Sequence, residues 1–188
     1  MVLALLGPCL ATTDAKGIKN SQAIIEQVKK LDLSYKGYTL GEQLDSSKLE
    51  KLKKSPVKES YPGTIKLHDG DLILVVDKKH KIIVAISKQI KKASSKQLKS
   101  LVSEMMLIFG EPTALAHEKI IYWAYGKNGK ITEEAYDKAK DVGKLEVIAT
   151  VKLNSSKEIF KVTSGKEPEA DVYVIISSEP LIKALITL

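Results

Sequence analysis

An amphipathic helix with a well-defined end constrains this chain more than any other sequence feature. Its apolar side chains recur at helical spacing and are Leu98, Leu101, Val102, Met105, Ile108 and Phe109. Ser94 and Gln97 have the spacing of a capping box at the start. Gly110 suits the left-handed position after a helix, and Pro112 prevents the helix from resuming. The stretch predicts a helix over residues 94–109 with one buried face, followed by a strand.

Three short strands are predicted before this helix, at residues 64–68, 72–76 and 81–86. Asp69-Gly70 is a typical two-residue hairpin turn between the first two. Residues 77–80 form the turn between the second and the third. The segment is therefore predicted to be an antiparallel meander.

Other elements follow from periodicity and from capping signals. Residues 21–31 have the apolar spacing of a helix, and Ser47 with Glu50 forms a capping box that opens a short helix. Ser178 is a cap for a final helix that runs to residue 188, with Pro180 in its first turn. The remaining predictions are strands at 119–125, 145–153 and 171–176, and a helical turn around 133–139.

In this order the elements predict an α+β fold, with an antiparallel sheet packed by helices. The order helix-strand-strand-strand occurs twice, in tentative halves at residues 45–87 and 94–177, the second expanded by insertions. Residues 16–188 are predicted to form one domain, and residues 1–15 are a candidate signal segment.

Two short motifs carry a family resemblance: "YKGYTLGEQLD" before the first of these helices and "IFGEP" at the end of the second. With them the chain resembles the β-lactamase-inhibitor-protein-like fold, which also includes the small outer-membrane assembly lipoproteins of the SmpA/OmlA type. The resemblance covers residues 35–178. It implies a partner bound on the concave sheet or its loops, and it brings no catalytic residue.

The positive net charge of the chain raises the question of whether the protein binds nucleic acid. The net charge is +7, but all 30 basic residues are Lys, and aromatic residues make up only 5%. Without Arg the chain lacks the bidentate fork that reads guanine, and few rings are present to stack on bases. Specific nucleic-acid binding is therefore disfavoured. A basic surface for nucleic acid or anionic lipid remains an alternative, and residues 88–99, with five Lys, are either such a surface or a solvated loop.

The first fifteen residues resemble the later part of a secretory signal peptide. An apolar run at residues 2–6 precedes small and polar residues, with Leu10-Ala11 and Asp14-Ala15 as candidate cleavage points. The charged beginning of such a peptide is missing, and Pro8 before Cys9 fits a lipoprotein motif badly. The prediction is a periplasmic or secreted protein, with a cytoplasmic protein as the alternative. No apolar run reaches the roughly 18 residues of a membrane span.

Candidate catalytic and metal-binding groups are few. His68 to Asp71, "HDGD", has the residue types of a metal site, but a hairpin turn explains the same letters. His80 lies at the other end of a strand of roughly 17 Å, too far to share an ion. Glu133 and Glu134 fall in a polar insert that is expected to be solvated. We therefore predict no catalytic residue, no metal ligand and no cofactor.

The strongest candidate for partner binding is "IIYWAYGKNGK" at residues 120–130. The predicted contact residues are Tyr122, Trp123, Tyr125, Lys127 and Asn128. Strand alternation places Tyr122 on one face, and Trp123 and Tyr125 on the other, so one aromatic set belongs to the core. The exposed set has the amphipathic character of binding hot spots. Aromatic residues packed entirely under the helices are the alternative.

These features together predict an exported, non-enzymatic binding protein whose partner is a protein or a cell-envelope component. An unrecognised hydrolase is a further alternative, which requires a cleft with a perturbed carboxylate or His. The sequence does not define the oligomeric state.

Overall fold

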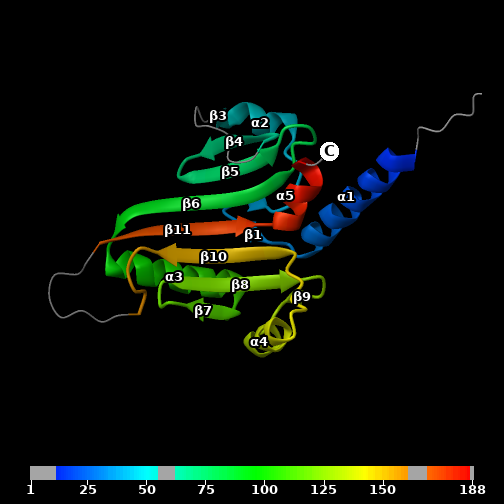
Figure 1. The fold of residues 1–188 in the computed structure, drawn as a ribbon. Coiled ribbons are helices and arrows are strands. Elements are labelled where there is room, and N and C mark those ends of the chain that lie inside the picture. The colour runs from blue at the N-terminus through cyan, green and yellow to red at the C-terminus, as the bar shows by residue number, and fades with distance from the viewer. Residues whose placement is uncertain (1–11, 55–61, 161–168, 187–188) are drawn as a thin grey trace, which may run out of the picture.

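The computed structural model describes residues 12–54, 62–160 and 169–186. Most strands form one sheet, in which the strands differ in length and every pair of neighbouring strands is antiparallel (Figure 1). In order across the sheet these are β3 (Lys53–Lys54), β4 (Thr64–Asp69), β5 (Leu72–Asp77), β6 (Ile83–Ala93), β11 (Ala170–Ser177), β10 (Ala149–Ser155), β8 (Ile120–Gly126) and β7 (Ala114–Ala116). The short β9 (Gly129–Lys130) also pairs with β8, and β1 (Ser34–Tyr35) and β2 (Tyr38–Thr39) form a separate hairpin.

Five helices complete the described fold: α1 (Thr12–Lys30), α2 (Ser46–Lys51), α3 (Ser95–Phe109), α4 (Glu133–Asp141) and α5 (Glu179–Ile186). α3 packs behind β6 and β11, and α1 packs against α5 at the end of the sheet where β11 finishes (Figure 1). The predicted α+β class, an antiparallel sheet packed by helices, is confirmed. No helix among the described residues is long and apolar enough to cross a membrane.

The two faces of the sheet differ in burial, because side chains alternate between the faces along each strand. In β10 and β11 every second residue is buried, from Val151 and Leu153 to Val172, Val174 and Ile176. This is the face that α3 covers with Leu98, Leu101, Val102, Met105 and Phe109. In these two strands the intervening residues point to the other face and remain partly exposed, so the core of β10 and β11 lies on one side of the sheet.

The ends of α3 follow from their residues. Ser94 and Gln97 form the predicted capping box, and Gly110 has a positive φ of 73°. A Cβ on Gly110 would lie 2.8 Å from Lys130 Nζ, the end of a flexible side chain that can move aside, so glycine is favoured there chiefly by the positive φ. One prediction is wrong: Ile108 is 46% exposed, because it lies at the edge of the stripe, in the last turn.

Several predicted boundaries need correction. The short helix is capped by Asp45, whose carboxylate accepts from Lys48 N, and Ser47 lies inside the helix. The first hairpin turn consists of Gly70 and Asp71, one residue later than predicted, because Asp69 pairs with Leu72. The strand predicted from residue 145 begins at Ala149.

The lysine-rich segment after residue 87 also needs correction, since residues 88–93 continue β6 instead of forming a loop. Lys88 points to the covered face, and its ammonium lies 2.6 Å from the Asp71 carboxylate. This hydrogen bond, more than the charge of Lys88, holds the pKa of Asp71 below its usual range. Pairing with β11 keeps this segment extended.

The N-terminal helix begins earlier than predicted, since α1 runs from Thr12 to Lys30 and contains all but the last residue of the predicted 21–31 stretch. Ser21 is buried and donates to the Ala184 carbonyl of α5 at 3.1 Å. Residues 1–11, with the apolar run and Cys9, lie outside the described residues. The candidate cleavage point Asp14-Ala15 falls inside α1.

The two tentative halves stay a prediction. Their last strands, β6 and β11, pair at the centre of the sheet, which an internal repeat would allow. Their helices differ, however: α2 has six residues and none of them is buried, whereas α3 has fifteen and buries five.

Candidate functional site

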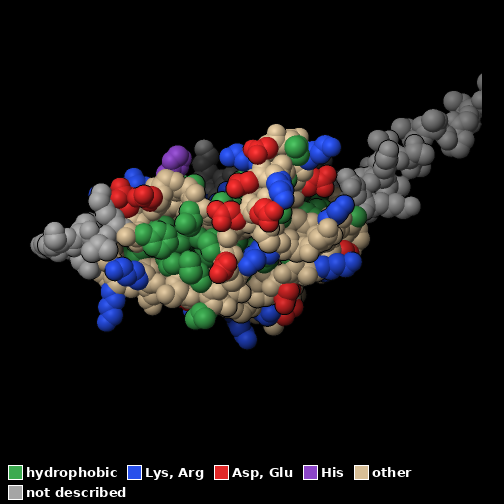
Figure 2. Space-filling view, turned by 90° about the horizontal axis from the view of Figure 1, so that it is seen from below, with side chains coloured by type: hydrophobic (Ala, Val, Ile, Leu, Met, Phe, Trp, Pro, Cys, Tyr) green, Lys and Arg blue, Asp and Glu red, His purple; other side chains and the backbone are tan. Residues whose placement is uncertain are grey.

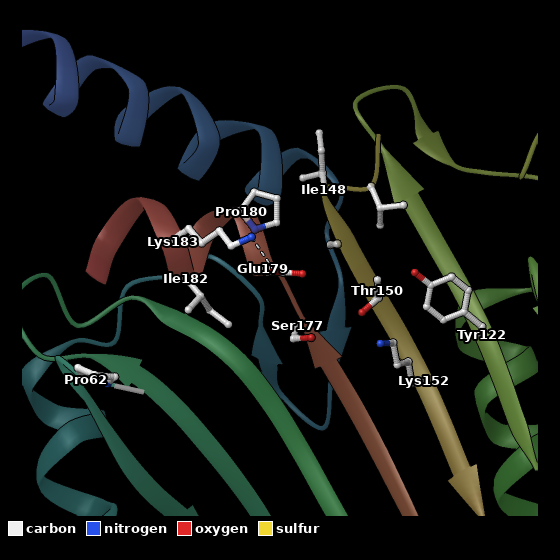
Figure 3. Close-up of a pocket in the computed structure, with 12 residues that line it drawn as sticks. Pro62, Tyr122, Ile148, Thr150, Lys152, Ser177, Glu179, Pro180, Ile182 and Lys183 are labelled. Carbon is white, nitrogen blue, oxygen red and sulfur yellow. Dashed lines mark ion pairs between the residues drawn. The ribbon is translucent and has the colours of Figure 1, made fainter. Parts of the chain in front are cut away.

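A pocket of about 540 Å³ lies on the uncovered face of the sheet, beside α5 (Figure 3). Its floor consists of Tyr122 from β8, Thr150 and Lys152 from β10, and Ser177 from β11. All four side chains project from the same side of these strands (Figure 3). Its volume is within the range of small-molecule sites, which is roughly 300–1,000 Å³.

The floor is positioned by the register of three neighbouring strands. Lys152 lies directly opposite Tyr122, and Thr150 lies directly opposite Ser177. Since alternation puts residues two apart on one face, these four side chains must meet there. The four positions are half-buried, which leaves their polar atoms near the pocket.

Tyr122 links the floor to α4. Its ring lies 5.4 Å from the Lys152 ammonium, within the range of a cation–π contact. On its other side the ring of Tyr136 from α4 makes an edge contact, with ring centroids 5.9 Å apart. Burial, and to a lesser extent Tyr136, raises the pKa of Tyr122 to about 12. The phenol is therefore a neutral hydrogen-bond donor at physiological pH.

The wall of the pocket is the start of α5, and Ser178 fixes it. Ser178 is fully buried, and its hydroxyl accepts from Leu181 N at 3.2 Å as the N-cap. The same hydroxyl donates to the Ile148 carbonyl at 2.7 Å, which ties the helix to the residue before β10. Apolar side chains from both sides, Ile148 and Ile182, then face the pocket.

Of the two lysines that line the pocket among the described residues, one forms an ion pair and the other does not. Glu179 and Lys183 of α5 form an ion pair of 2.7 Å, drawn as a dashed line in Figure 3. The hydrogen bond and charge of Lys183, with a smaller contribution from the charge of Lys152, lower the pKa of Glu179. Among the described residues no carboxylate lies within ion-pair distance of Lys152. Its ammonium therefore faces a ring and hydroxyl groups instead of a counterion.

The structure divides the predicted partner-binding residues. Trp123 is fully buried, packs on Phe109 with ring centroids 6.2 Å apart, and donates from Nε1 to the Gly110 carbonyl at 2.8 Å. Tyr125 is buried as well, and burial raises its pKa to about 12. Both belong to the core, so neither forms part of a contact surface. Their face of β8 is the one that α3 covers.

Lys127 and Asn128 are exposed at the tip of the β8–β9 hairpin. They line a different pocket, of about 380 Å³, between this hairpin and α4. Tyr122 is therefore the one residue of the predicted set that lies in the pocket beside α5. The five residues do not form one surface.

The candidate metal and acid groups are used in local structure. Asp69 accepts from Tyr38 Oη at 2.8 Å, and Asp77 accepts from the backbone N–H of His80. Within the described ranges no group of three or more His, Cys, Asp or Glu side chains is placed to hold a metal ion. Glu134 is exposed and pairs with Lys138 at 2.7 Å, which agrees with a solvated insert.

A further pocket, of about 280 Å³, lies where α3 begins. Three lysines line it, Lys99, Lys119 and Lys157, together with Ser95 and Ser156. Glu158 lines it as well. Among the described residues its charges match those of the pocket between the β8–β9 hairpin and α4, since each is lined by three lysines and one glutamate.

The pocket residues Thr150, Lys152 and Ser177 were not predicted as a site. Their strands do show polar residues at alternate positions, "ATVKLNS" and "DVYVIIS", which indicates one polar face. That pattern cannot show which polar residues become neighbours, because this depends on the register between strands. Comparison with protein-family models, curated protein sequences and solved structures finds no match for this chain.

Proposed function

We propose that this protein is a non-enzymatic binding protein that holds its partner on the uncovered face of the sheet, around the pocket beside α5. The observation that carries the proposal is this half-covered sheet, on which an aromatic ring, an ammonium group and hydroxyl groups meet in one pocket. Such a concave site with a few convergent polar groups is the usual form of a binding site.

The composition of the pocket favours binding over catalysis. The chain has three histidines, His68, His80 and His117, and none of them lines this pocket. The hydroxyls of Thr150 and Ser177 therefore have no imidazole base beside them, and an imidazole is a common activating group for a nucleophilic hydroxyl. The resemblance to the β-lactamase-inhibitor-protein-like fold also implies a partner held without catalysis.

The proposal places the protein outside the cytoplasm, on the signal-like composition of residues 1–15. Cleavage at Leu10-Ala11 would leave α1 complete, whereas cleavage at Asp14-Ala15 would remove its first residues. The intact mass of the protein from fractionated native cells tests this. We expect the processed mass in the envelope or secreted fraction, and the full mass in the cytoplasm would contradict export.

Site-specific photocrosslinking tests the binding surface. A benzophenone amino acid replaces Tyr173, which is exposed on the same sheet face as Ser177, and in a control protein it replaces Lys96, exposed on α3. We expect a crosslink to an envelope component from position 173, competed by unlabelled protein. Equal crosslinking from both positions, or none from position 173, would contradict the proposed surface.

A second candidate function is binding of anionic surfaces, and the lysines of the pocket at the start of α3 favour it. Binding of this kind weakens steeply with salt. Co-sedimentation with vesicles of anionic lipid at low and high salt tests it, with the double variant Lys99→Gln, Lys119→Gln as the probe. Binding that is unchanged by salt or by these substitutions would exclude this candidate.

A further inference from the structure

We propose that the ligand of the pocket beside α5 is a small organic monocarboxylate with an apolar body, whose carboxylate is bound by Lys152 and the hydroxyls around it. The inference rests on the proposed binding function and names the chemistry of what is bound. It is carried by the juxtaposition of Lys152, Tyr122, Thr150 and Ser177 on the floor with apolar residues on the walls.

Lys152 lacks a counterion among the described residues. The residue lies in the middle of β10, which has a strand on each side, and its direct neighbours on this face are Tyr122 and Ile175. A half-buried ammonium loses part of its hydration, and no described carboxylate pairs with it. The contact with the Tyr122 ring compensates only in part. An anionic ligand would provide the missing partner.

Neutral hydrogen-bond donors lie on the same pocket floor as Lys152. Thr150 and Ser177 are cross-strand neighbours, and each has a hydroxyl on the pocket floor. The Tyr122 phenol keeps its proton at physiological pH, so it can donate as well. A carboxylate has two oxygens that accept several hydrogen bonds, so it can use the ammonium and hydroxyl donors together.

The charge balance favours a single negative charge over two. Lys183 is engaged with Glu179, whereas the other described lysine of the lining, Lys152, has no described carboxylate at ion-pair distance. Glu179 itself lines the pocket and repels a second negative charge. A carboxylate therefore fits better than a phosphate dianion.

The walls indicate the rest of the ligand. Ile148, Ile182 and Pro180 line the pocket next to the polar floor, and the volume of about 540 Å³ limits the ligand to a small molecule. Apolar contact of this kind favours an alkyl or similar body. A medium-chain fatty acid is the simplest probe with this chemistry.

Titration calorimetry with decanoate, octanoate and hexanoate tests the inference on the full chain. We expect saturable binding whose affinity rises about threefold to fourfold for each added methylene, as apolar burial predicts. Decan-1-ol has the same body without the charge, and it should bind at least about tenfold more weakly, because a charge-assisted hydrogen bond is lost. Equal affinity for decanol and decanoate would overturn the proposal.

The variants Lys152→Gln and Tyr122→Phe locate the binding. Lys152→Gln should weaken decanoate binding at least about tenfold and leave decanol binding nearly unchanged. Lys96→Gln removes the same charge from an exposed position on α3 and should change neither. Tyr122→Phe, which deletes one hydroxyl, should cause a smaller loss. Decanoate binding that is equal in Lys152→Gln and Lys96→Gln would overturn the proposal.

The wider partner surface and the ligand of the pocket can be tested separately. If position 173 crosslinks an envelope component but decanoate does not bind, the ligand class is wrong and the proposed surface stands. If decanoate binds with the expected dependence on Lys152 but position 173 crosslinks nothing, the inferred ligand class stands and the wider partner surface is wrong. Amide chemical shifts near Ile148 and Ser177 confirm which residues the ligand contacts.

Discussion

Trp123 and Lys152 show that a shift of one position along a strand decides whether a side chain enters the core or the pocket. They lie on neighbouring strands, and the partner of Trp123 across the β8–β10 pair is Val151, one residue before Lys152. One residue along a strand reverses the direction of the side chain. Trp123 therefore packs under α3, whereas Lys152 points into the pocket on the opposite face.

The first prediction concerns Trp123. Trp123→Phe should lower the free energy of unfolding by about 2–4 kcal/mol, because it removes a buried hydrogen bond to the Gly110 carbonyl and leaves a cavity against Phe109. Urea unfolding measures this, with Tyr173→Phe, at a 38% exposed residue, as the matched control. Equal unfolding midpoints in the two variants would show that the indole is not buried.

The second prediction concerns Thr113, which is 1% exposed. Its hydroxyl donates to the Ile131 carbonyl at 2.6 Å and accepts from Ala124 N at 3.0 Å. Thr113→Val should lower the free energy of unfolding by about 1–3 kcal/mol, since both backbone groups lose a buried partner. Thr150→Val, on the pocket floor, is the isosteric control and should have a smaller effect in the same urea titration. A neutral Thr113→Val would rule out this bridge.

At the scale of elements, short polar contacts decide where helices begin and end. Asp45, Ser94, Thr132 and Ser178 each accept a backbone N–H at the start of a helix. At the other end of α3, the Lys130 ammonium donates to the carbonyls of Phe109 and Glu111. The four caps are local contacts, whereas Lys130 joins β9 to the end of α3, across 21 and 19 residues of sequence.

The third prediction tests the capping box of α3. Ser94→Ala should lower the free energy of unfolding by about 1 kcal/mol, because it removes the acceptor for the Gln97 N–H. Ser100→Ala, at an exposed position inside the same helix, should be neutral or slightly stabilising. Thermal unfolding of the two variants compares them directly. A destabilisation equal in both would show that the cap contributes nothing.

At the scale of the whole molecule, the pocket exists because α3 covers one face of the sheet and much of the other face stays open. α3 packs on the apolar face of β6 and β11, whereas α4 and α5 contact only part of the opposite face. Seen from the β7 edge, hydrophobic side chains gather beside this edge strand, with acidic and basic side chains around them (Figure 2). The pocket lies on the other side of the same strands.

The fourth prediction concerns alkaline pH. The pKa values of Tyr122 and Tyr125 are raised to about 12, largely by burial. An unfolded tyrosine has a pKa of about 10, so from about pH 10 to 12 the unfolded chain loses protons that the folded chain keeps. The free energy of unfolding should therefore fall as the pH rises through this window, with no such contribution below it.

Urea unfolding at about pH 8, 10 and 11 measures this fall. Tyr125→Phe is the informative variant, because it removes one phenol that the fold shields. The stability of Tyr125→Phe should rise relative to that of the unmodified chain between pH 8 and pH 11, because the variant lacks this titrating phenol. A constant difference across the series would contradict the shifted pKa.

The sequence by itself determined the elements whose signals are local. The capping box and apolar stripe of α3, the meander of β4 to β6, the Ser178 cap and the α+β class depend on residues a few positions apart. Spacing along the chain is enough to predict such features. The errors at Asp45, Gly70 and residues 88–93 are shifts at element ends, where neighbouring residues offer similar turn or cap chemistry.

The tertiary structure alone decided which residues form the pocket. Alternation showed that Tyr122 and Trp123 face opposite ways, but not which face α3 would cover. Thr150, Lys152 and Ser177 become neighbours of Tyr122 only through the pairing of β8, β10 and β11, strands separated by long insertions. Register between distant strands depends on packing over the whole sheet, so no local pattern in the sequence encodes it.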